Sequence, residues 1–275
     1  LVAAQLLEGH GQATVRIANT RLGELGTAAG QLVAYPYGCV EQTTSRLLAL
    51  LVLREQPGFL RGAVTNQPQL EAMIRSGLTH LLSMQNREGG LGYWPGSHAP
   101  TLWGSAYGSL ALTLARREGL TIDEPAYERL LGFLFGQLPG TSQVTEPHAV
   151  EERCLALYAL AYADRPQASY HDVLLARMPD LSTQARAWLA LAVATSADPS
   201  NLAVEILTTK VPLQADSESW FGNEASDTAI RLLAWLRVRP DDPAVEVLVA
   251  ELLRARQNAH WMSTQGNAWA LLALS

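Results

Sequence analysis

Apolar residues recur at intervals of three and four along most of the chain, which is the period of an amphipathic α-helix. Pro, Gly and clusters of Asp, Asn and Ser interrupt this pattern at short intervals and mark the ends of helices. The pattern predicts twelve helices, near residues 17–34, 40–54, 67–86, 102–118, 124–138, 147–164, 168–178, 182–196, 199–209, 225–238, 242–256 and 263–275. Strand-like segments are limited to 13–17 and to the 208–221 connection, which could hold a small hairpin.

The predicted helices alternate in character along the chain. Every second helix is rich in Ala and Leu, as in 104–115 and 187–194, whereas the helices between them carry more charge, as in 246–256. A helix that is apolar around most of its circumference is buried, and a helix with one apolar stripe covers a surface. We therefore expect an all-α fold, an α/α toroid of six inner and six outer helices over residues 17–275, after a short, extended lead-in at 1–16.

The predicted ring also concentrates candidate chemistry on one face. Trp-containing turns at Trp94, Trp220 and Trp261 precede three of the inner helices, and such a repeat is typical of stacked helical pairs. If the inner helices all run in the same direction, their N-terminal ends share one rim of the ring. The positive ends of six helix dipoles favour a thiolate or an oxyanion there. This rim is therefore the expected location of the functional site.

Composition narrows the functional classes. The chain has 275 residues, 48% of them hydrophobic, with a net charge of −6, so it offers no basic surface for nucleic acid. No apolar run reaches the roughly 18 residues that span a membrane. Two cysteines, Cys39 and Cys154, form neither a disulfide scaffold nor a four-ligand zinc site, and we expect no cofactor or metal. Because the chain begins without Met and stops within a periodic apolar run, we expect it to be part of a longer protein.

The most informative motif lies at the start of the second predicted helix. Residues 35–45 read Tyr-Pro-Tyr-Gly-Cys-Val-Glu-Gln-Thr-Thr-Ser. Cys39 and Gln42 are three residues apart, so their side chains can meet on one side of the first helical turn. A Cys sulfur beside a Gln carboxamide can form an internal thioester with loss of ammonia. The alternative is a structural Cys at an ordinary helix start.

The residues around Cys39 suit a protected acyl group. Tyr35 and Tyr37 are aromatic neighbours that could keep water from such a bond, and Gly38 permits a tight approach to the helix. Glu41 is either an ordinary N-terminal helix charge or a residue that orients the thioester. Cys154, in an apolar helix, is expected to be a small core residue.

The complete motif resembles the thioester motif of the α2-macroglobulin and complement C3/C4 superfamily, especially its bacterial α2-macroglobulin branch. Two further segments are similar to that family: the Trp-Met-Ser-Thr-Gln segment at 261–265, and the glycine-rich turn at 89–94 with the Thr-Leu-Trp that follows at 101–103. The resemblance covers about residues 31–275, and the family's thioester domain is an α/α toroid. Val40 departs from the Gly that vertebrate members usually carry, which leaves the chemistry intact.

The resemblance implies a single-use covalent protease trap and not a turnover enzyme. Cys39 would supply the sulfur and Gln42 the acyl carbon, which an amine or hydroxyl of an attacking protease would take after bait cleavage. Implied partners are target proteases and other domains of the same parent chain, with no nucleic acid and no direct membrane insertion by this segment. The implied location is the periplasm, with the parent anchored to the inner membrane.

Some complement members carry a histidine about a hundred residues after the thioester, which accepts the acyl group first. His148 follows Cys39 at a similar separation, at the start of the sixth predicted helix. An imidazole suits this role because its pKa lies near neutrality. His98 and His260 belong to the same predicted rim and are weaker candidates.

Two other functional classes remain open. One is a noncovalent interaction module in which Cys39 and Gln42 are merely structural. The other is an enzyme on the same toroid, such as a terpene cyclase or a prenyltransferase. That class needs an Asp-rich motif or an Asp/Cys/His zinc site facing the cavity, and the segments that precede the inner helices contain neither.

Overall fold

A computed structural model describes residues 25–35, 38–60, 63–196, 200–209, 222–257 and 260–275 of the chain. Twelve α-helices lie in these residues: α1 (Gly26–Ala34), α2 (Val40–Val52), α3 (Gln67–Leu82), α4 (Leu102–Arg117), α5 (Glu124–Gly136), α6 (Pro147–Tyr162), α7 (His171–Leu175), α8 (Thr183–Thr195), α9 (Ser200–Thr208), α10 (Glu224–Val238), α11 (Pro243–Arg254) and α12 (Thr264–Leu274). Within these ranges there is no β-strand beyond two isolated bridges, Gln85–Leu91 and Gln257–His260. The predicted all-α class is confirmed.

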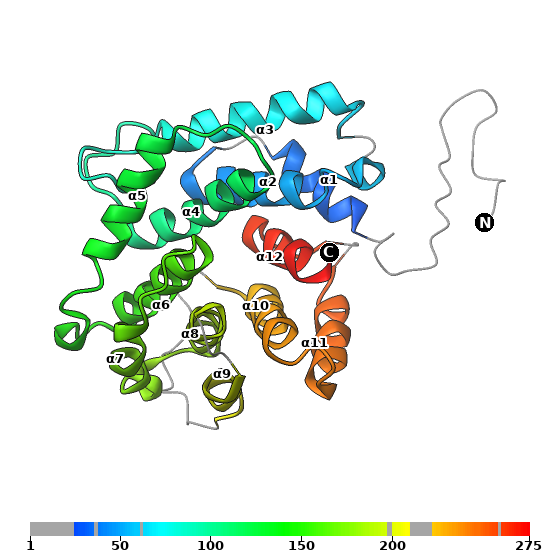
Figure 1. The fold of residues 1–275 in the computed structure, drawn as a ribbon. Coiled ribbons are helices and arrows are strands. Elements are labelled where there is room, and N and C mark those ends of the chain that lie inside the picture. The colour runs from blue at the N-terminus through cyan, green and yellow to red at the C-terminus, as the bar shows by residue number, and fades with distance from the viewer. Residues whose placement is uncertain (1–24, 36–37, 61–62, 197–199, 210–221, 258–259) are drawn as a thin grey trace, which may run out of the picture.

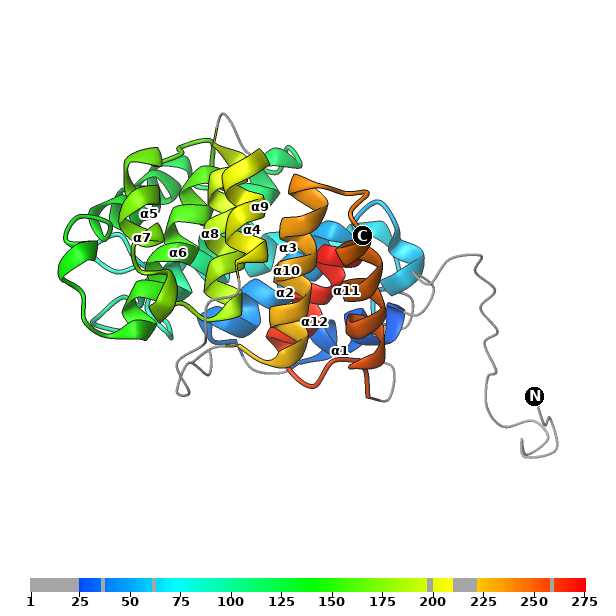
Figure 2. The same cartoon turned by 90° about the horizontal axis from the view of Figure 1, so that it is seen from below.

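The even-numbered helices form a closed ring. Each packs against the next, from α2 through α4, α6, α8 and α10 to α12, and α12 packs back against α2. Figure 1 shows these helices following one another around the centre of the molecule, with α3, α5, α7, α9 and α11 outside them, and Figure 2 gives the view from below. The odd-numbered helices lie against the inner ring. The predicted α/α toroid, with alternating inner and outer helices, is therefore confirmed.

Most predicted helix bounds agree with the structure to within a few residues, with one clear exception. The helix predicted over 168–178 is wrong, because only His171–Leu175 is α-helical and 3₁₀ turns at Ala168–Tyr170 and Met178–Asp180 flank it. Pro179 lies in the second turn and cannot supply the N–H that an α-helix would need there. The predicted lead-in at 1–16, the predicted helical residues 17–24 and most of the 208–221 connection, including Trp220, lie outside the described residues.

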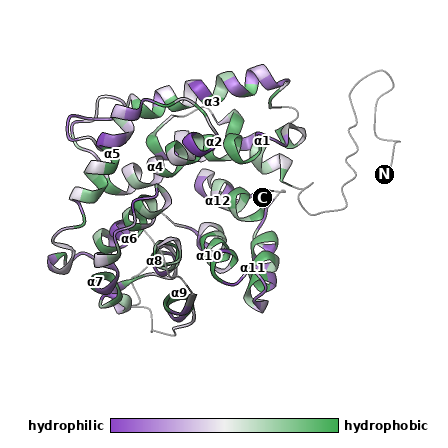
Figure 3. Cartoon of the chain, in the orientation of Figure 1, coloured by the Kyte–Doolittle hydropathy of each residue, from purple (hydrophilic) through white to green (hydrophobic). Residues whose placement is uncertain are grey.

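Burial follows the alternation of the two helix types. Thirteen residues of the inner helix α4, nearly its whole sequence, are buried, whereas the outer helix α11 buries only Leu248 and Leu252. Figure 3 shows the purple, hydrophilic stretches along the outer helices α3, α5 and α7. Removal of apolar surface from water is thus concentrated in the inner ring, which drives the helices together around one core.

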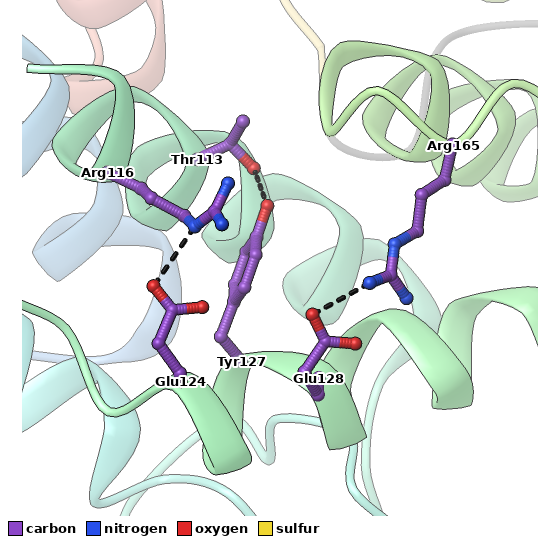
Figure 4. A network of polar contacts seen from close by, with 6 residues as sticks. All are labelled: Thr113, Arg116, Glu124, Tyr127, Glu128 and Arg165. Atoms are coloured by element: carbon purple, nitrogen blue, oxygen red, sulfur yellow. Dashed lines mark hydrogen bonds and ion pairs between the residues drawn. The ribbon is translucent and has the colours of Figure 1, made fainter.

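Outer helices are fastened by polar contacts as well as by packing. The Thr113 and Tyr127 hydroxyls join α4 to α5 in a buried hydrogen bond of 2.7 Å. Arg116 and Glu124 add a 3.0 Å ion pair nearby, and Arg165 after α6 pairs with Glu128 of α5 at 2.7 Å (Figure 4). Both ion pairs are about half exposed and contribute little to stability on their own. The buried hydroxyl pair specifies how α5 sits on the ring.

Aromatic rings fill the core beside α2. Tyr107 of α4 stacks on Trp269 of α12, with ring centroids 5.6 Å apart and an interplanar angle of 29°. Trp103 also packs against Tyr107, with ring centroids 5.1 Å apart. All three side chains are almost completely buried. Because they come from the two inner helices that flank α2, they fix the position of that helix within the ring.

We expect Trp269→Ala to lower the free energy of unfolding by about 3–5 kcal/mol, because it removes a large buried side chain and leaves a cavity beside Tyr107. Urea denaturation followed by circular dichroism measures the change. The matched control is Trp94→Ala, since Trp94 is 47% exposed, and its effect should stay below about 1 kcal/mol. Equal effects of the two substitutions would contradict a core role for Trp269.

Candidate functional site

The first turn of α2 brings Cys39 and Gln42 together. Cys39 is the N-cap residue, with φ −70° and ψ 171°, and the two residues form a reciprocal capping box. The backbone N–H of Gln42 points to the Cys39 sulfur. In return, the Cys39 N–H donates a hydrogen bond of 3.3 Å to Oε1 of Gln42. Each side chain thus folds back over the backbone of the other, as the i, i+3 spacing predicts.

The glycine-rich turn that precedes α4 covers this first turn. The carbonyl of Tyr93 accepts a 3.0 Å hydrogen bond from the Val40 N–H, so it satisfies one of the unpaired donors at the start of α2. The Tyr93 hydroxyl also reaches Cys39. A hydrogen bond with the Cys39 side chain, followed in size by burial, raises the pKa of Tyr93 to about 12. Sequence reasoning placed Tyr93 only in the glycine-rich motif and missed its contact with the sulfur.

Tight packing surrounds the sulfur on the protein side. Cys39 is only 1% exposed, and Val40 is fully buried. A Cβ atom built on Gly104 of α4 would lie 2.9 Å from Cγ1 of Val40, so the two helix starts meet as closely as a glycine allows. Gly38 is equally constrained by His80 of α3, whose Nε2 lies 2.8 Å from the Gly38 carbonyl oxygen. The sequence gives no signal for the His80 contact, because the two residues belong to different helical pairs.

Glu41 turns into the ring and joins α2 to α12. The Thr264 hydroxyl lies 2.8 Å from each of its carboxylate oxygens and shares its one proton between them. Ser45 donates to Oε1 at 2.8 Å, and its hydroxyl lies 3.0 Å from that of Tyr107. Burial raises the pKa of the Glu41 carboxyl, and the hydrogen bonds from Ser45 and Thr264 partly offset that effect. Glu41 is therefore a half-buried, hydrogen-bonded group and not a solvated helix charge.

Similar polar contacts link every neighbouring pair of inner helices near their N-terminal ends, and we call this set the rim belt. Side-chain oxygens and amides near the start of one helix reach the next helix, as capping groups often do. From α12 around to α10, the links are Thr264–Glu41, Ser45–Tyr107, Trp103–Glu152, Ser182–Glu151, Gln184–Ser226 and Asn223–Ser263. The N-terminal ends of the inner helices therefore share one rim, and Cys39 lies on it.

The histidines occupy different positions. His148 is exposed in the first turn of α6, beside Glu151 and Glu152. Because α4 packs between α6 and α2, His148 is separated from the first turn of α2 by one inner helix. His98 is exposed in the glycine-rich turn, where its carbonyl accepts from Asn86. His260 is half-buried before α12, with Nδ1 3.3 Å from the Trp261 carbonyl.

The predicted shielding residues are only partly described. Tyr35 ends α1 and is 38% exposed, while Tyr37 lies outside the described residues. Tyr93 and Trp94, 42% and 47% exposed, add two more aromatic side chains beside the start of α2. Cys154 is completely buried in α6, which raises the pKa of its thiol well above the ordinary value. Its environment is that of a core residue, as expected.

Metal and membrane sites were also sought in the part of the chain that the structure describes. Among those residues, no group of three His, Cys, Asp or Glu side chains is arranged to hold a metal ion. No described helix combines the length and apolarity that a bilayer crossing requires.

The fold and the rim define an α/α toroid with a buried Cys-x-x-Gln turn at the start of an inner helix. No protein-family model matches the chain. It is 28% identical over 262 residues to the α2-macroglobulin of Escherichia coli strain K12, which covers 88% of this chain. The chain spans only 16% of the length of that relative.

Solved structures agree with this similarity. A crystal structure of native E. coli α2-macroglobulin from domain MG7 to the C-terminus matches 90% of this chain and 41% of its own, with a TM-score of 0.78 and 24% identity. Salmonella α2-macroglobulin reacted with methylamine matches 91% of this chain and 17% of its own, with a TM-score of 0.78 and 25% identity. E. coli α2-macroglobulin activated by porcine elastase matches 88% of this chain and 23% of its own, with a TM-score of 0.73 and 24% identity.

The resemblance predicted from the sequence motifs is therefore confirmed. The chain is similar in sequence and in fold to one segment of the bacterial α2-macroglobulins. This similarity connects it with a family related to protease inhibition.

We expect Thr264→Val to lower the free energy of unfolding by about 2 kcal/mol at pH 7.5, because a half-buried carboxylate loses its donor from α12. The pKa of Glu41 should rise further, since the lost hydrogen bonds favour the ionised form. An acid with a raised pKa in the folded state costs stability as the pH rises through that pKa. The deficit should therefore be smaller at acidic pH, where Glu41 is protonated.

Urea denaturation at several pH values measures this effect. Thr264→Ser is the matched control, because it keeps the hydroxyl and loses only a methyl group. The same loss in both variants, or a loss that does not change with pH, would contradict the role of the Glu41–Thr264 contact.

Proposed function

We propose that this chain is the thioester domain of a bacterial protease-trapping inhibitor. The observation that carries the proposal is the reciprocal contact between Cys39 and Gln42 around a nearly inaccessible sulfur. A thioester needs its sulfur and its carboxamide on the same side of one turn, and the capping box supports that arrangement because it holds both side chains at the first turn of α2.

Formation of the bond follows from the atoms that face each other. The Cys39 sulfur attacks Cδ of Gln42, the carbon–nitrogen bond breaks, and the carboxamide nitrogen leaves with the thiol proton as ammonia. Oε1 stays on the acyl carbon, and it already accepts the Cys39 N–H. That N–H stabilises the negative charge that develops on Oε1 during the attack. The backbone N–H of Gln42 points at the sulfur and favours negative charge there when the bond opens again.

Reaction with a target runs in the direction opposite to the first step, with the sulfur now as the leaving group. An amine of a protease, such as a Lys side chain, attacks the acyl carbon, the carbon–sulfur bond breaks, and the proton passes to the released Cys39 sulfur. The protein is consumed in this transfer, so it acts once and does not turn over. The methylamine-reacted Salmonella protein and the elastase-activated E. coli protein support the same assignment of amines as acceptors and of proteases as partners.

Protection of the bond is shared between this chain and its surroundings. Tyr93 lies against the sulfur from one side, while Tyr35 and Trp94 remain partly exposed at the same rim. We infer that Tyr35 and the other aromatic side chains meet a neighbouring domain of the parent protein, which keeps water away until bait cleavage. By the same resemblance, the parent is a periplasmic protein anchored to the inner membrane, with no cofactor other than the Cys39–Gln42 cross-link.

Mass spectrometry of the full-length protein tests the proposal. The intact protein should be lighter than its encoded mass by about 17 Da, should incorporate one methylamine, and should then release one thiol. Cys39→Ala should abolish both the mass deficit and the incorporation. Cys154→Ala is the matched control and should keep both, because Cys154 lies in the core of α6. A protein of encoded mass that is inert to methylamine would instead favour the noncovalent interaction module.

We further propose that His148 transfers the acyl group to hydroxyl acceptors. His148→Ala should lower glycerol incorporation about tenfold while methylamine incorporation stays unchanged, because a hydroxyl needs more help than an amine does. Rates with the two acceptors measure the split, and His98→Ala, another exposed histidine near the rim, is the control. Unchanged rates with both acceptors would remove the assignment.

A further inference from the structure

His80 is a titratable side chain beside Gly38 that the proposed chemistry leaves unused. It lies in the last turn of the outer helix α3 and is half-buried. Its Nε2 lies 2.8 Å from the carbonyl oxygen of Gly38, 42 residues earlier in the chain. A carbonyl oxygen carries no proton, so Nε2 must be the donor in this contact.

Gly38 and His80 fit each other closely. A Cβ atom built on Gly38 would lie 2.9 Å from the His80 Nε2 atom, closer than side chains normally approach. The imidazole therefore rests directly on the Gly38 backbone, and any other residue at position 38 would displace it. This contact explains the glycine without any appeal to an unusual backbone angle.

The Gly38 carbonyl and the Cys39 N–H belong to one peptide group. His80 donates to the oxygen of that group, and the N–H of the same group donates to Oε1 of Gln42 at 3.3 Å. Hydrogen bonds that pass through one peptide group polarise each other. A donor on the carbonyl side therefore makes the Cys39 N–H a stronger donor toward Oε1.

Oε1 is the atom on which charge develops in the proposed reaction. It becomes the thioester carbonyl oxygen, and it gains negative charge both when the bond forms and when an amine opens it. A separation of 3.3 Å is long for an N–H···O hydrogen bond, so this contact can shorten as the charge increases. Interactions that strengthen in the transition state are the ones that accelerate a reaction.

We propose that His80 is a positioning residue for the acyl chemistry, which orients and polarises the Gly38–Cys39 peptide so that its N–H stabilises the negative charge on Oε1 of Gln42. The inference rests on the proposed thioester. It adds a helix outside the ring to the machinery of the site, because α3 contributes neither the sulfur nor the acyl carbon.

Substitutions of His80 in the full-length protein test the inference. His80→Gln keeps an N–H donor near the position of Nε2, and His80→Leu removes the donor while filling similar space. Each protein is first assayed for its thioester content by mass, and the rate constant for methylamine attack is then measured on the bond that has formed. We expect His80→Leu to react about tenfold more slowly than the wild type, and His80→Gln to stay within about threefold.

A purely structural role of His80 gives a different pattern. It would lower the melting temperature without changing the rate at which a formed bond reacts with methylamine. The inference is overturned if His80→Leu reacts at the wild-type rate, or if His80→Gln and His80→Leu are slowed equally. A folded His80→Leu protein that forms no thioester, beside a His80→Gln protein that does, supports it, because formation also develops charge on Oε1.

Two further variants keep the test decisive. If His80→Leu fails to fold, His80→Asn replaces it, because the shorter amide cannot reach the Gly38 oxygen. Gly38→Ala should displace the imidazole and slow the reaction to the same extent, with little additional effect in the double variant. Failure of the proposed function is distinguished from failure of this inference by the wild-type protein. If the wild type has its encoded mass and takes up no methylamine, no thioester forms and the proposed function fails.

Discussion

The packing of α12 against α2, which the hydrogen bond from Thr264 to Glu41 bridges, closes the ring on which the rest of the structure depends. It joins the first inner helix to the last across 223 residues of sequence. A toroid without this seam would be an open solenoid, whose end helices would expose their apolar faces. The rim belt provides the same kind of link between each of the remaining neighbouring pairs of inner helices. The seam differs from the other links because Glu41 lies two residues after Cys39 and directly before Gln42.

This position connects two requirements that conflict in most proteins. The proposed acyl group must be kept from water, yet it must lie close enough to the surface to meet a target. The first turn of α2 meets both, because its inner side is held by Glu41 and the aromatic core while its outer side is covered by Tyr93. Val40 against Gly104 closes the remaining gap toward α4. Close packing on the inner side and Tyr93 on the outer side fit the proposed acyl donor.

The sequence predicted the parts of the structure that depend on local periodicity. Helix alternation gave the inner and outer rings, and the spacing of Cys39 and Gln42 predicted their contact on one turn. The failures have physical causes. Pro179 shortened a predicted helix, and the contacts of Tyr93 with Cys39 and of His80 with Gly38 depend on how distant segments pack. Such contacts follow from the register between helices, which no short pattern in one chain encodes.

The packing of α1 against α12 has a mechanical consequence. The first and last helices of the toroid are neighbours, so force applied to the two ends acts across a single short junction. Tension between them would load the seam at Glu41 before it reached the far side of the ring. A rearrangement elsewhere in a larger assembly that pulls on these ends would therefore strain the start of α2 directly. The core of the ring would not have to change its packing.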